Sequence, residues 1–360
     1  MSHNGTSFQL LNLTNYQVTA SPGFADWLAE QNVSLALTNT LGHRLFFIGR
    51  DGRDELSVFA QNYDRCMGLW AVDSQTIYMV TRYQVWRLEN GVPAGEWVDD
   101  GYDRLYIPQM AHTTGHVNIH DIAVGDDDRI YFTNTRFACL AAVSPRKSFT
   151  PLWKPPFISE LAPEDRCHLN GLALRDGQPR YMTSFSQTNS HEGWRETRLG
   201  GGVVTDVMTN ETVATGLTMP HSPRYYRDAL WLTSSGTGEF GRVDMARGRF
   251  EPIAFAPGFL RGLAFHGDYA IVGSSKPRHG DFFDGIPLQT ELERRGLEPL
   301  RGLFVIDLRS GDVCHWFSLE GVTGEVYDVI TLPGVRRPKS LSISGDDIQN
   351  MVTVGPTAPL

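Results

Sequence analysis

A short apolar segment recurs along this chain at a long and nearly regular spacing. The clearest copy is His168–Ala173, where a polar loop gives way to hydrophobic residues. In each copy a polar or bulky residue precedes a small or acidic one. The equivalent small or acidic residues are Gly68, Asp121, Gly171, Ser222, Gly262 and Asp328, which are 53, 50, 51, 40 and 66 residues apart. Repeats of this length, followed by further strand-like segments, are typical of the four-stranded blades of a β-propeller.

The repeat predicts an all-β fold, a six-bladed β-propeller that forms one domain over residues 1–360. A chain of 360 residues exceeds the usual size of a single core. A propeller escapes this limit because each blade packs only on its neighbours. Three strand-like segments, 33–38, 44–49 and 56–59, precede the first repeat. We expect them to complete the last blade and to close the ring without free edges.

Two segments depart from the strand pattern. Residues 1–32 form an N-terminal arm with a short helix at 21–30, for which Ser21 is the expected cap. Residues 276–300 form an insertion in the fifth blade, and their spacing of leucines predicts a short helix that Pro287 opens and Gly296 closes.

The composition excludes several classes of partner. The net charge is -9 and the basic residues are dispersed, so we expect no binding to nucleic acid. No run of 18 apolar residues is present, which predicts no membrane span, and the first residues lack the layout of a signal peptide. The four cysteines are scattered without metal-binding spacing, which indicates reduced thiols and a cytoplasmic location. The oligomeric state is not indicated.

The first strand of each propeller blade lines the central channel, so its opening residues gather at one mouth. Three of the 11 histidines fall near this place in different repeats: His120, His168 and His221. His168 is two residues out of step with the other two. The further polar residues that the same alignment brings to the mouth are Asn170, Arg261, Glu325, Tyr327 and Asp121.

Two functional hypotheses follow, both for an enzyme that acts on a small organic molecule. In the first, His120, His168 and His221 bind a transition metal, with Asn170 or Glu325 near it. Imidazole is a ligand that suits zinc, iron or copper. In the second there is no metal: a histidine, Glu325 and Tyr327 act as acid and base, and Arg261 holds an anionic group.

Two alternatives involve no catalysis. The polar side chains at the channel mouth could bond one another and ordered water, and so only plug the channel. Many propellers are also binding or assembly scaffolds, which is the competing class of function. The reaction type stays open between hydrolysis, isomerisation, cyclisation and oxidation.

The segment His168–Ala173 resembles the Asn-Gly-Leu motif of the gluconolactonase-like and strictosidine-synthase-like six-bladed propellers. The segments Glu325–Val329 and Leu332–Pro338 are similar to those of a family of conserved hypothetical bacterial propellers, a resemblance that extends over most of the chain. The second resemblance implies the fold but brings no chemistry with it.

The first resemblance implies where a site would lie. In gluconolactonase-like enzymes a Glu, two Asn and an Asp hold calcium at the channel. Asn170 matches one Asn, but the other motif positions are Met67, His120 and His221. This exchange of hard oxygen ligands makes calcium less favourable than a softer metal or none. Strictosidine-synthase-like members use a channel glutamate without metal, and Glu325 is the nearest candidate here.

Overall fold

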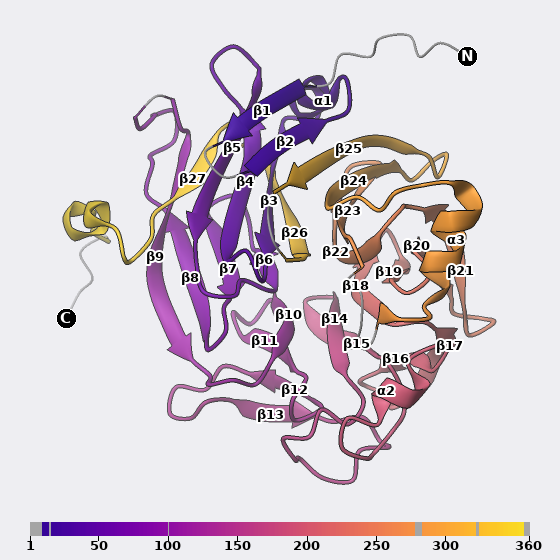
Figure 1. The fold of residues 1–360 in the computed structure, drawn as a ribbon. Helices are drawn as coiled ribbons and strands as arrows, with labels where there is room; N and C mark the ends of the chain where they lie inside the picture. The colour runs from indigo at the N-terminus through magenta and orange to yellow at the C-terminus, as the bar shows by residue number, and fades with distance from the viewer. Residues whose placement is uncertain (1–8, 14–15, 100, 278–282, 322–323, 356–360) are drawn as a thin grey trace, which may run out of the picture.

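The structure is a computed structural model that describes residues 9–13, 16–99, 101–277, 283–321 and 324–355. Its β-sheets surround a common centre in a β-propeller-like arrangement (Figure 1). One strand of each repeat lies at this centre. Each of these first strands contacts the next, and the last contacts the first. In order they are β6 (Leu69–Ala71), β10 (Ile119–Val124), β14 (Leu169–Arg175), β18 (Pro220–Tyr226), β22 (Phe259–His266) and β26 (Val326–Pro333).

Antiparallel strands continue outward from the first strands. β7 (Thr76–Val80), β8 (Gln84–Asn90) and β9 (Arg104–Thr113) follow β6, and β11 (Ile130–Asn134), β12 (Cys139–Ala142) and β13 (Thr150–Trp153) follow β10. β15 (Gln178–Ser184), β16 (Gly202–Asp206) and β17 (Thr212–Leu217) follow β14. β19 (Ala229–Ser234), β20 (Glu239–Asp244) and β21 (Arg249–Phe255) follow β18, and β23 (Tyr269–Ser275), β24 (Gly302–Asp307) and β25 (Val313–Glu320) follow β22. The sheets of β14 and β18 join into one of eight strands through a parallel contact of β17 with β21, at Thr215 and Arg249.

The two ends of the chain share one sheet. β3 (Val33–Asn39), β4 (Arg44–Arg50) and β5 (Leu56–Asn62) follow β26 in the order β26-β3-β4-β5. The pairing of β26 with β3 runs from Val326 opposite Asn39 to Pro333 opposite Val33. The prediction that the N-terminal strands complete the last repeat is therefore confirmed.

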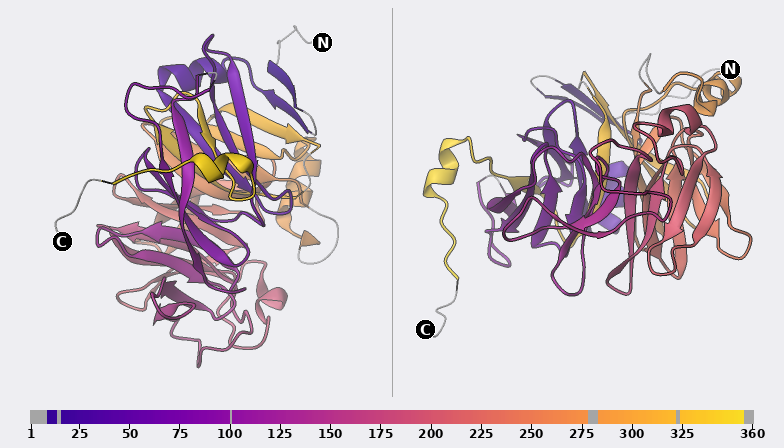
Figure 2. Two further views of the ribbon diagram at one scale, coloured as in Figure 1. Left: turned by 90° about the vertical axis from the view of Figure 1, so that its left-hand side faces the viewer. Right: turned by 90° about the horizontal axis from the view of Figure 1, so that it is seen from below.

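Further strands cover two outer edges, which the sequence analysis did not predict. β2 (Tyr16–Ala20) pairs with β25, and β1 (Gln9–Leu13) pairs with β2. β27 (Pro338–Ser340) lies parallel to β9, and the short 3₁₀ helix η2 (Asp346–Asn350) follows it on the outside of the molecule (Figure 2). Covered edges remove the open backbone groups that would pair with other chains.

The helices are short. α1 (Phe24–Glu30) begins after Gly23, whose φ of 73° makes the turn, and the predicted cap at Ser21 is wrong. The Ser21 hydroxyl instead accepts the N–H of Trp316 at 3.1 Å. α2 (Trp194–Thr197) lies after β15. The described helices include none that is long and apolar enough to cross a membrane.

The helix predicted in the insertion is confirmed. α3 (Pro287–Arg295) has Pro287 in its first turn and ends at Gly296, which has a φ of 62°. Leu288 and Leu292 are both buried, because residues four apart lie on the same face of a helix. The first part of the insertion, 278–282, lies outside the described residues.

The equivalent small or acidic residues of the six repeats, which we call the repeat points, connect neighbouring first strands along the axis. An acidic or hydroxyl side chain from one first strand accepts a backbone N–H from the first strand that follows it in the ring. Each such bond joins neighbouring repeats and satisfies a buried backbone donor. The bonds join Asp121 to Leu172 at 3.0 Å, Ser222 to Gly262 at 2.9 Å, and Asp328 to Leu69 at 2.8 Å.

Glycine stands at the alternate repeat points because the next first strand comes too close for a side chain. A Cβ added to Gly171 would lie 2.2 Å from Cδ of Pro223. Gly262 has a φ of 76°, and a Cβ there would lie 2.7 Å from Cα of Asp328. The alternation of glycine with polar residues, visible in the sequence, therefore reflects the packing of the first strands. The polar residues bond the next first strand, and the glycines allow the next first strand to approach closely.

Candidate functional site

The candidate site is a chamber where the first strands begin. Its cavity volume is about 300 Å³, and its walls come from β10, β22, β26, α2, the turn after β3 and the loops before β6 and β14. The polar side chains of the wall that bear on function are Arg65, His120, Asp165, His168, Arg261, Glu325 and Tyr327. His221 and Asn170 lie outside this lining.

His120 is held through its Nδ1 atom. This atom lies 2.9 Å from the carbonyl oxygen of Asn118 and 2.8 Å from Oγ1 of Thr135, whose hydroxyl donates to the carbonyl of Leu169 at 2.6 Å. Because a carbonyl oxygen only accepts, Nδ1 carries the proton and Nε2 presents a lone pair. Burial, and then the neighbouring His168, hold the pKa of His120 well below its usual value, so its ring is neutral at pH 7.

His221 repeats this geometry one sheet further around the ring. Its Nδ1 lies 2.9 Å from the carbonyl oxygen of Met219 and 2.8 Å from the hydroxyl of Ser235. Burial, and then Arg261, hold the pKa of His221 well below its usual value. Its Nε2 is buried and has no hydrogen-bond partner in the part of the chain that the structure describes. A buried acceptor of this kind calls for a donor from water or a bound molecule.

His168 belongs to a different place in the repeat. It has a φ of 49°, and the left-handed conformation recurs at Arg65, Asn118 and Met219, with φ of 46°, 55° and 53°. The offset of two residues seen in the sequence is therefore real, and His168 is the equivalent of Asn118. Its Nδ1 lies 2.9 Å from Oδ2 of Asp165.

Aromatic contacts fix the ring of His168. The centroids of His168 and His120 are 4.7 Å apart with the planes nearly perpendicular. Phe185 and Trp194 each lie 4.4 Å from the His168 ring. The carboxylate of Asp165 accepts the Nδ1 proton, so the lone pair of His168 is on Nε2. A carboxylate that orients an imidazole in this way is the arrangement found in catalytic His–Asp pairs.

Arg261, Glu325 and Tyr327 meet on the other wall. Arg261 and Glu325 form a buried ion pair, and each side chain is 6% exposed. The guanidinium of Arg261 lies 5.2 Å from the centre of the Tyr327 ring. Burial raises the pKa of Tyr327, and its hydroxyl has no hydrogen-bond partner among the described residues. Tyr327 is therefore a neutral hydroxyl that can donate to a bound molecule.

The structure brings two of the predicted metal ligands together, His120 and His168, whose ring centroids are 4.7 Å apart. The described residues contain no group of three or more His, Cys, Asp or Glu side chains that could hold a metal ion. Phe185 contacts both His168 and His221, with ring centroids at 4.4 and 5.2 Å. The side-chain oxygen of Asn170 accepts the hydroxyl of Thr183 at 2.9 Å and is thus already used. These donors do not fit a three-imidazole site supported by Asn170.

Asp121 lies outside the chamber lining, in a buried cluster of charged side chains. Its two oxygens accept from Arg224 at 2.8 and 3.1 Å, and Arg224 is also 3.7 Å from Asp328. Burial, partly offset by Arg224, raises the pKa of Asp328 to about 7. We call Asp121, Arg224 and Asp328 the axial cluster. Its position gives Asp121 a part in joining repeats rather than in the chamber wall.

Sequence reasoning missed Asp165, Trp194 and Arg224. Asp165 precedes His168 by three residues in a loop, and such a spacing alone occurs too often to be a signal. Trp194 lies in the long segment after β15, which reads in the sequence as a loop over a site. Arg224 follows Ser222 and Pro223 in β18, where the residue type indicates nothing until the strand is placed on the axis.

The comparison with solved structures gives a likeness of fold. A chain in the crystal structure of a nidogen/laminin complex has 12% sequence identity and a TM-score of 0.54, over 84% of this chain and 99% of that one. A gluconolactonase from Xanthomonas campestris has 13% identity and a TM-score of 0.43, over 82% and 86% of the two chains. Virginiamycin B lyase from Staphylococcus aureus has 11% identity and a TM-score of 0.41, over 87% and 99%.

The sequence comparisons give a family. A search of the curated proteins finds no match. A model described as "Domain of unknown function (DUF4915)" matches residues 22–341, which is most of the chain and includes every first strand. The protein therefore belongs to the DUF4915 family.

Proposed function

We propose that this protein is a six-bladed β-propeller enzyme that acts on a small polar molecule by general acid–base chemistry in the chamber. The observation that carries the proposal is the pair of Asp165 and His168 in the chamber wall, with a second, neutral imidazole beside it. The free thiols of all four cysteines support a reducing compartment, the cytoplasm, as its location.

Division of the eight-stranded sheet into two halves supports the proposed number of blades. The strand pairing between the sheets of β14 and β18 is one parallel residue pair, Thr215 with Arg249, whereas antiparallel registers of several residues hold the strands within each half. Division at this contact leaves six four-stranded units, each with one first strand. The edge strands β1, β2 and β27 are then additions to the outside of two blades.

His168 is the proposed base. Asp165 holds its Nδ1 proton and fixes the ring, which leaves the Nε2 lone pair to take a proton from the substrate or from water. His120 also presents an Nε2 lone pair, but burial depresses its pKa, so it suits accepting a hydrogen bond from a substrate hydroxyl rather than taking the proton. The two imidazoles thus have different parts in the same chamber.

Tyr327 and Arg65 are the proposed substrate contacts opposite the base. The Tyr327 hydroxyl is a neutral donor that suits a carbonyl oxygen on which charge develops. Arg261 is paired with Glu325, whereas Arg65 makes no ion pair with a carboxylate in the described part of the chain. Arg65 is therefore the cation that suits an anionic group, so the substrate class is a small carboxylate or hydroxy acid, or its lactone.

Proton exchange tests the proposal without knowledge of the product. The wild-type protein is incubated in D₂O with a panel of 2-hydroxy acids, 2-oxo acids and lactones, and ¹H NMR follows deuterium uptake and turnover. His168→Gln should reduce the rate about 10²- to 10⁴-fold, the usual contribution of a positioned base. Asp165→Asn should reduce it by less and shift the pH profile, because Asp165 acts only through the ring that it orients.

A matched control is available on the surface. His112, on the outer strand β9 and outside the chamber lining, donates from Nε2 to the carbonyl of Ser148 at 3.1 Å, so His112→Gln should leave the rate unchanged. Turnover that survives His168→Gln would refute the proposed base. Panel members that bind in the chamber, with no exchange or turnover by any of them, would instead support the competing class, a binding scaffold.

Metal content tests the other hypothesis separately. Stoichiometric zinc, iron or copper in the purified protein, lost on His120→Ala or His221→Ala, would show that the imidazoles do gather around a metal. We expect substoichiometric metal, because the donors described above do not form a set of three.

A further inference from the structure

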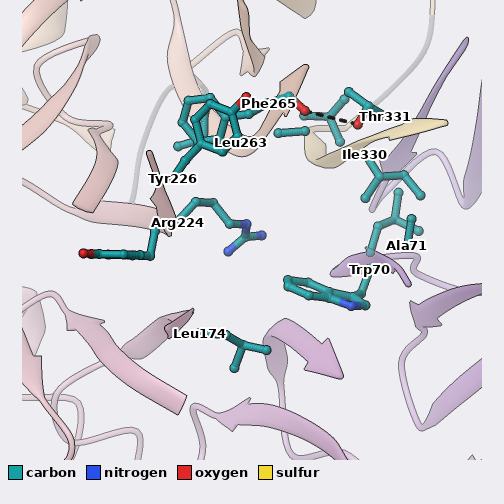
Figure 3. A pocket seen from close by; sticks show the side chains of 13 residues that line it. Trp70, Ala71, Leu174, Arg224, Tyr226, Leu263, Phe265, Ile330 and Thr331 are labelled. Atoms are coloured by element: carbon teal, nitrogen blue, oxygen red, sulfur yellow. Dashed lines mark hydrogen bonds between the residues drawn. The ribbon is translucent and has the colours of Figure 1, made fainter. Parts of the chain in front are cut away.

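A second cavity lies at the other end of the same first strands. Its volume is about 260 Å³, and residues of β6, β14, β18, β22 and β26 surround it (Figure 3). Tyr327 in the chamber and Thr331 in the second cavity are both on β26. The two residues are four positions apart, or roughly 13 Å along the strand. The two cavities are therefore distinct sites at opposite mouths of the channel.

The walls of the second cavity are apolar and aromatic. Tyr226 and Phe265 stack with ring centroids 4.4 Å apart and planes at 4°, and Trp70 stands across the cavity from them (Figure 3). The hydroxyl of Thr331 already donates to the carbonyl of Phe265 at 3.3 Å. A cavity with aromatic rings on two sides suits a flat apolar molecule, which can lie against a ring face.

Arg224 is the charged side chain of this lining, and its guanidinium points into the space between Trp70 and the stacked rings (Figure 3). Nη1 donates to Asp121 and to the carbonyls of Pro223 and Leu172, at 2.8, 2.9 and 3.1 Å. Nη1 is therefore fully used. Nη2 donates to Asp121 at 3.1 Å, and Nε makes no hydrogen bond to a described residue, which makes Nε a donor for a bound molecule.

We propose that the second cavity binds a small, flat, uncharged molecule that is mostly apolar and that accepts a hydrogen bond from Arg224 through a carbonyl oxygen. The rings of Trp70, Tyr226 and Phe265 hold its apolar part. The site is independent of the chamber chemistry proposed above, because it shares no lining residue with the chamber.

The charges of the axial cluster favour a neutral ligand in the second cavity. Asp121 and Asp328 already offer two carboxylates to the one guanidinium of Arg224, so an anionic ligand would bring a third negative group. A cation would meet the guanidinium itself, since Arg224 and not a carboxylate faces the cavity. A carbonyl oxygen satisfies the guanidinium without either repulsion.

The size of the second cavity favours a small molecule rather than a polypeptide as its ligand. Its volume of about 260 Å³ lies just below the ~300–1,000 Å³ typical of pockets that bind small molecules. First strands enclose it on several sides, so a helix or strand of a partner has no groove to enter.

Four naphthalene probes of one shape test the proposal by saturation-transfer NMR and calorimetry on the full chain. 2-Naphthamide is neutral with a carbonyl, naphthalene lacks an acceptor, 2-naphthoate is an anion and 2-naphthylmethylammonium is a cation. We expect 2-naphthamide to bind at a single site and the other three to bind about tenfold more weakly. Preference for the anion or the cation would overturn the proposal, as would the absence of saturable binding.

Single substitutions test whether 2-naphthamide binds in the second cavity. Trp70→Ala should weaken binding of 2-naphthamide about tenfold, and Leu174→Trp should abolish it by filling the cavity. Trp97→Ala, which removes a tryptophan that is 53% exposed and outside the cavity, should leave the affinity unchanged. His168→Gln should also leave it unchanged, which separates this site from the chamber. Equal affinity in wild type and Leu174→Trp would overturn the assignment.

Discussion

Removal of the guanidinium from the axial cluster is the sharpest test of how the ring is held. In the native protein Arg224 bonds both oxygens of Asp121 and two backbone carbonyls, and it lies 3.7 Å from Asp328. The two aspartates are each only 4% exposed. Arg224→Met keeps most of the volume but leaves two carboxylates buried without a cation.

The magnitude follows from the cost of an unpaired buried charge, which is about 3–5 kcal/mol. For a chain of 360 residues, unfolding entropy of about 2.1 cal/mol/K per residue sums to about 0.75 kcal/mol/K. A loss of about 4 kcal/mol thus lowers Tm by about 5 °C, if the chain unfolds as one unit. This loss is a large fraction of the ~5–15 kcal/mol that stabilises a folded protein.

Calorimetry and urea denaturation at two pH values check the cause as well as the size. Without Arg224 the carboxylates favour their protonated forms, so the variant should recover stability relative to wild type as pH falls from 8 to 5.5. The triple variant with Asp121→Asn and Asp328→Asn should recover stability at pH 8 also, because Asn keeps an acceptor oxygen.

The control is Arg227→Met. Arg227 pairs with Asp268 at 2.5 Å, but the two side chains are 53% and 40% exposed, and such surface pairs contribute ~0–1 kcal/mol. If Arg224→Met cost less than about 1 kcal/mol, or the same at both pH values, the axial cluster would not hold the ring as argued.

Three further predictions concern the axis and the thiols. Gly171→Ala should destabilise the protein by about 1–3 kcal/mol in urea denaturation, since its methyl would meet Cδ of Pro223 at 2.2 Å. Asp328→Asn should flatten the pH dependence of stability. In the wild type the pKa of Asp328 is about 7 in the folded state and near 4 in the unfolded state. Its contribution to the free energy of unfolding is therefore full below about pH 4 and is lost as pH rises through 7, and unfolding in this range releases up to about one proton per molecule. Alkylation of the native protein at pH 8 should label exposed Cys314 first, whereas Cys66, which is buried and has a raised pKa, should react only on unfolding; equal labelling rates would contradict this.

The sequence by itself determined the first strands of the repeats, the strands that close the ring and the helix of the insertion, in their order along the chain. The spacing of the repeat points predicted where the first strands lie, because strand propensity and turn residues act over a few neighbours. It also predicted the helix of the insertion and the sharing of one sheet by the two chain ends, which β26 and β3 confirm. The convergence of His120 with His168 and Tyr327 followed from the same alignment.

Only the tertiary structure decided which polar groups pair. Asp328 bonds a backbone 259 residues away at Leu69, and Arg224 reaches Asp121 across 103 residues. Such bonds depend on the angle at which successive sheets pack, which no local pattern encodes. For the same reason the sequence pointed to a shared centre for three imidazoles. In the fold, the ring of His168 lies beside that of His120 but the described residues form no set of three donors, and Asp165, which the pattern did not single out, is the group that orients His168.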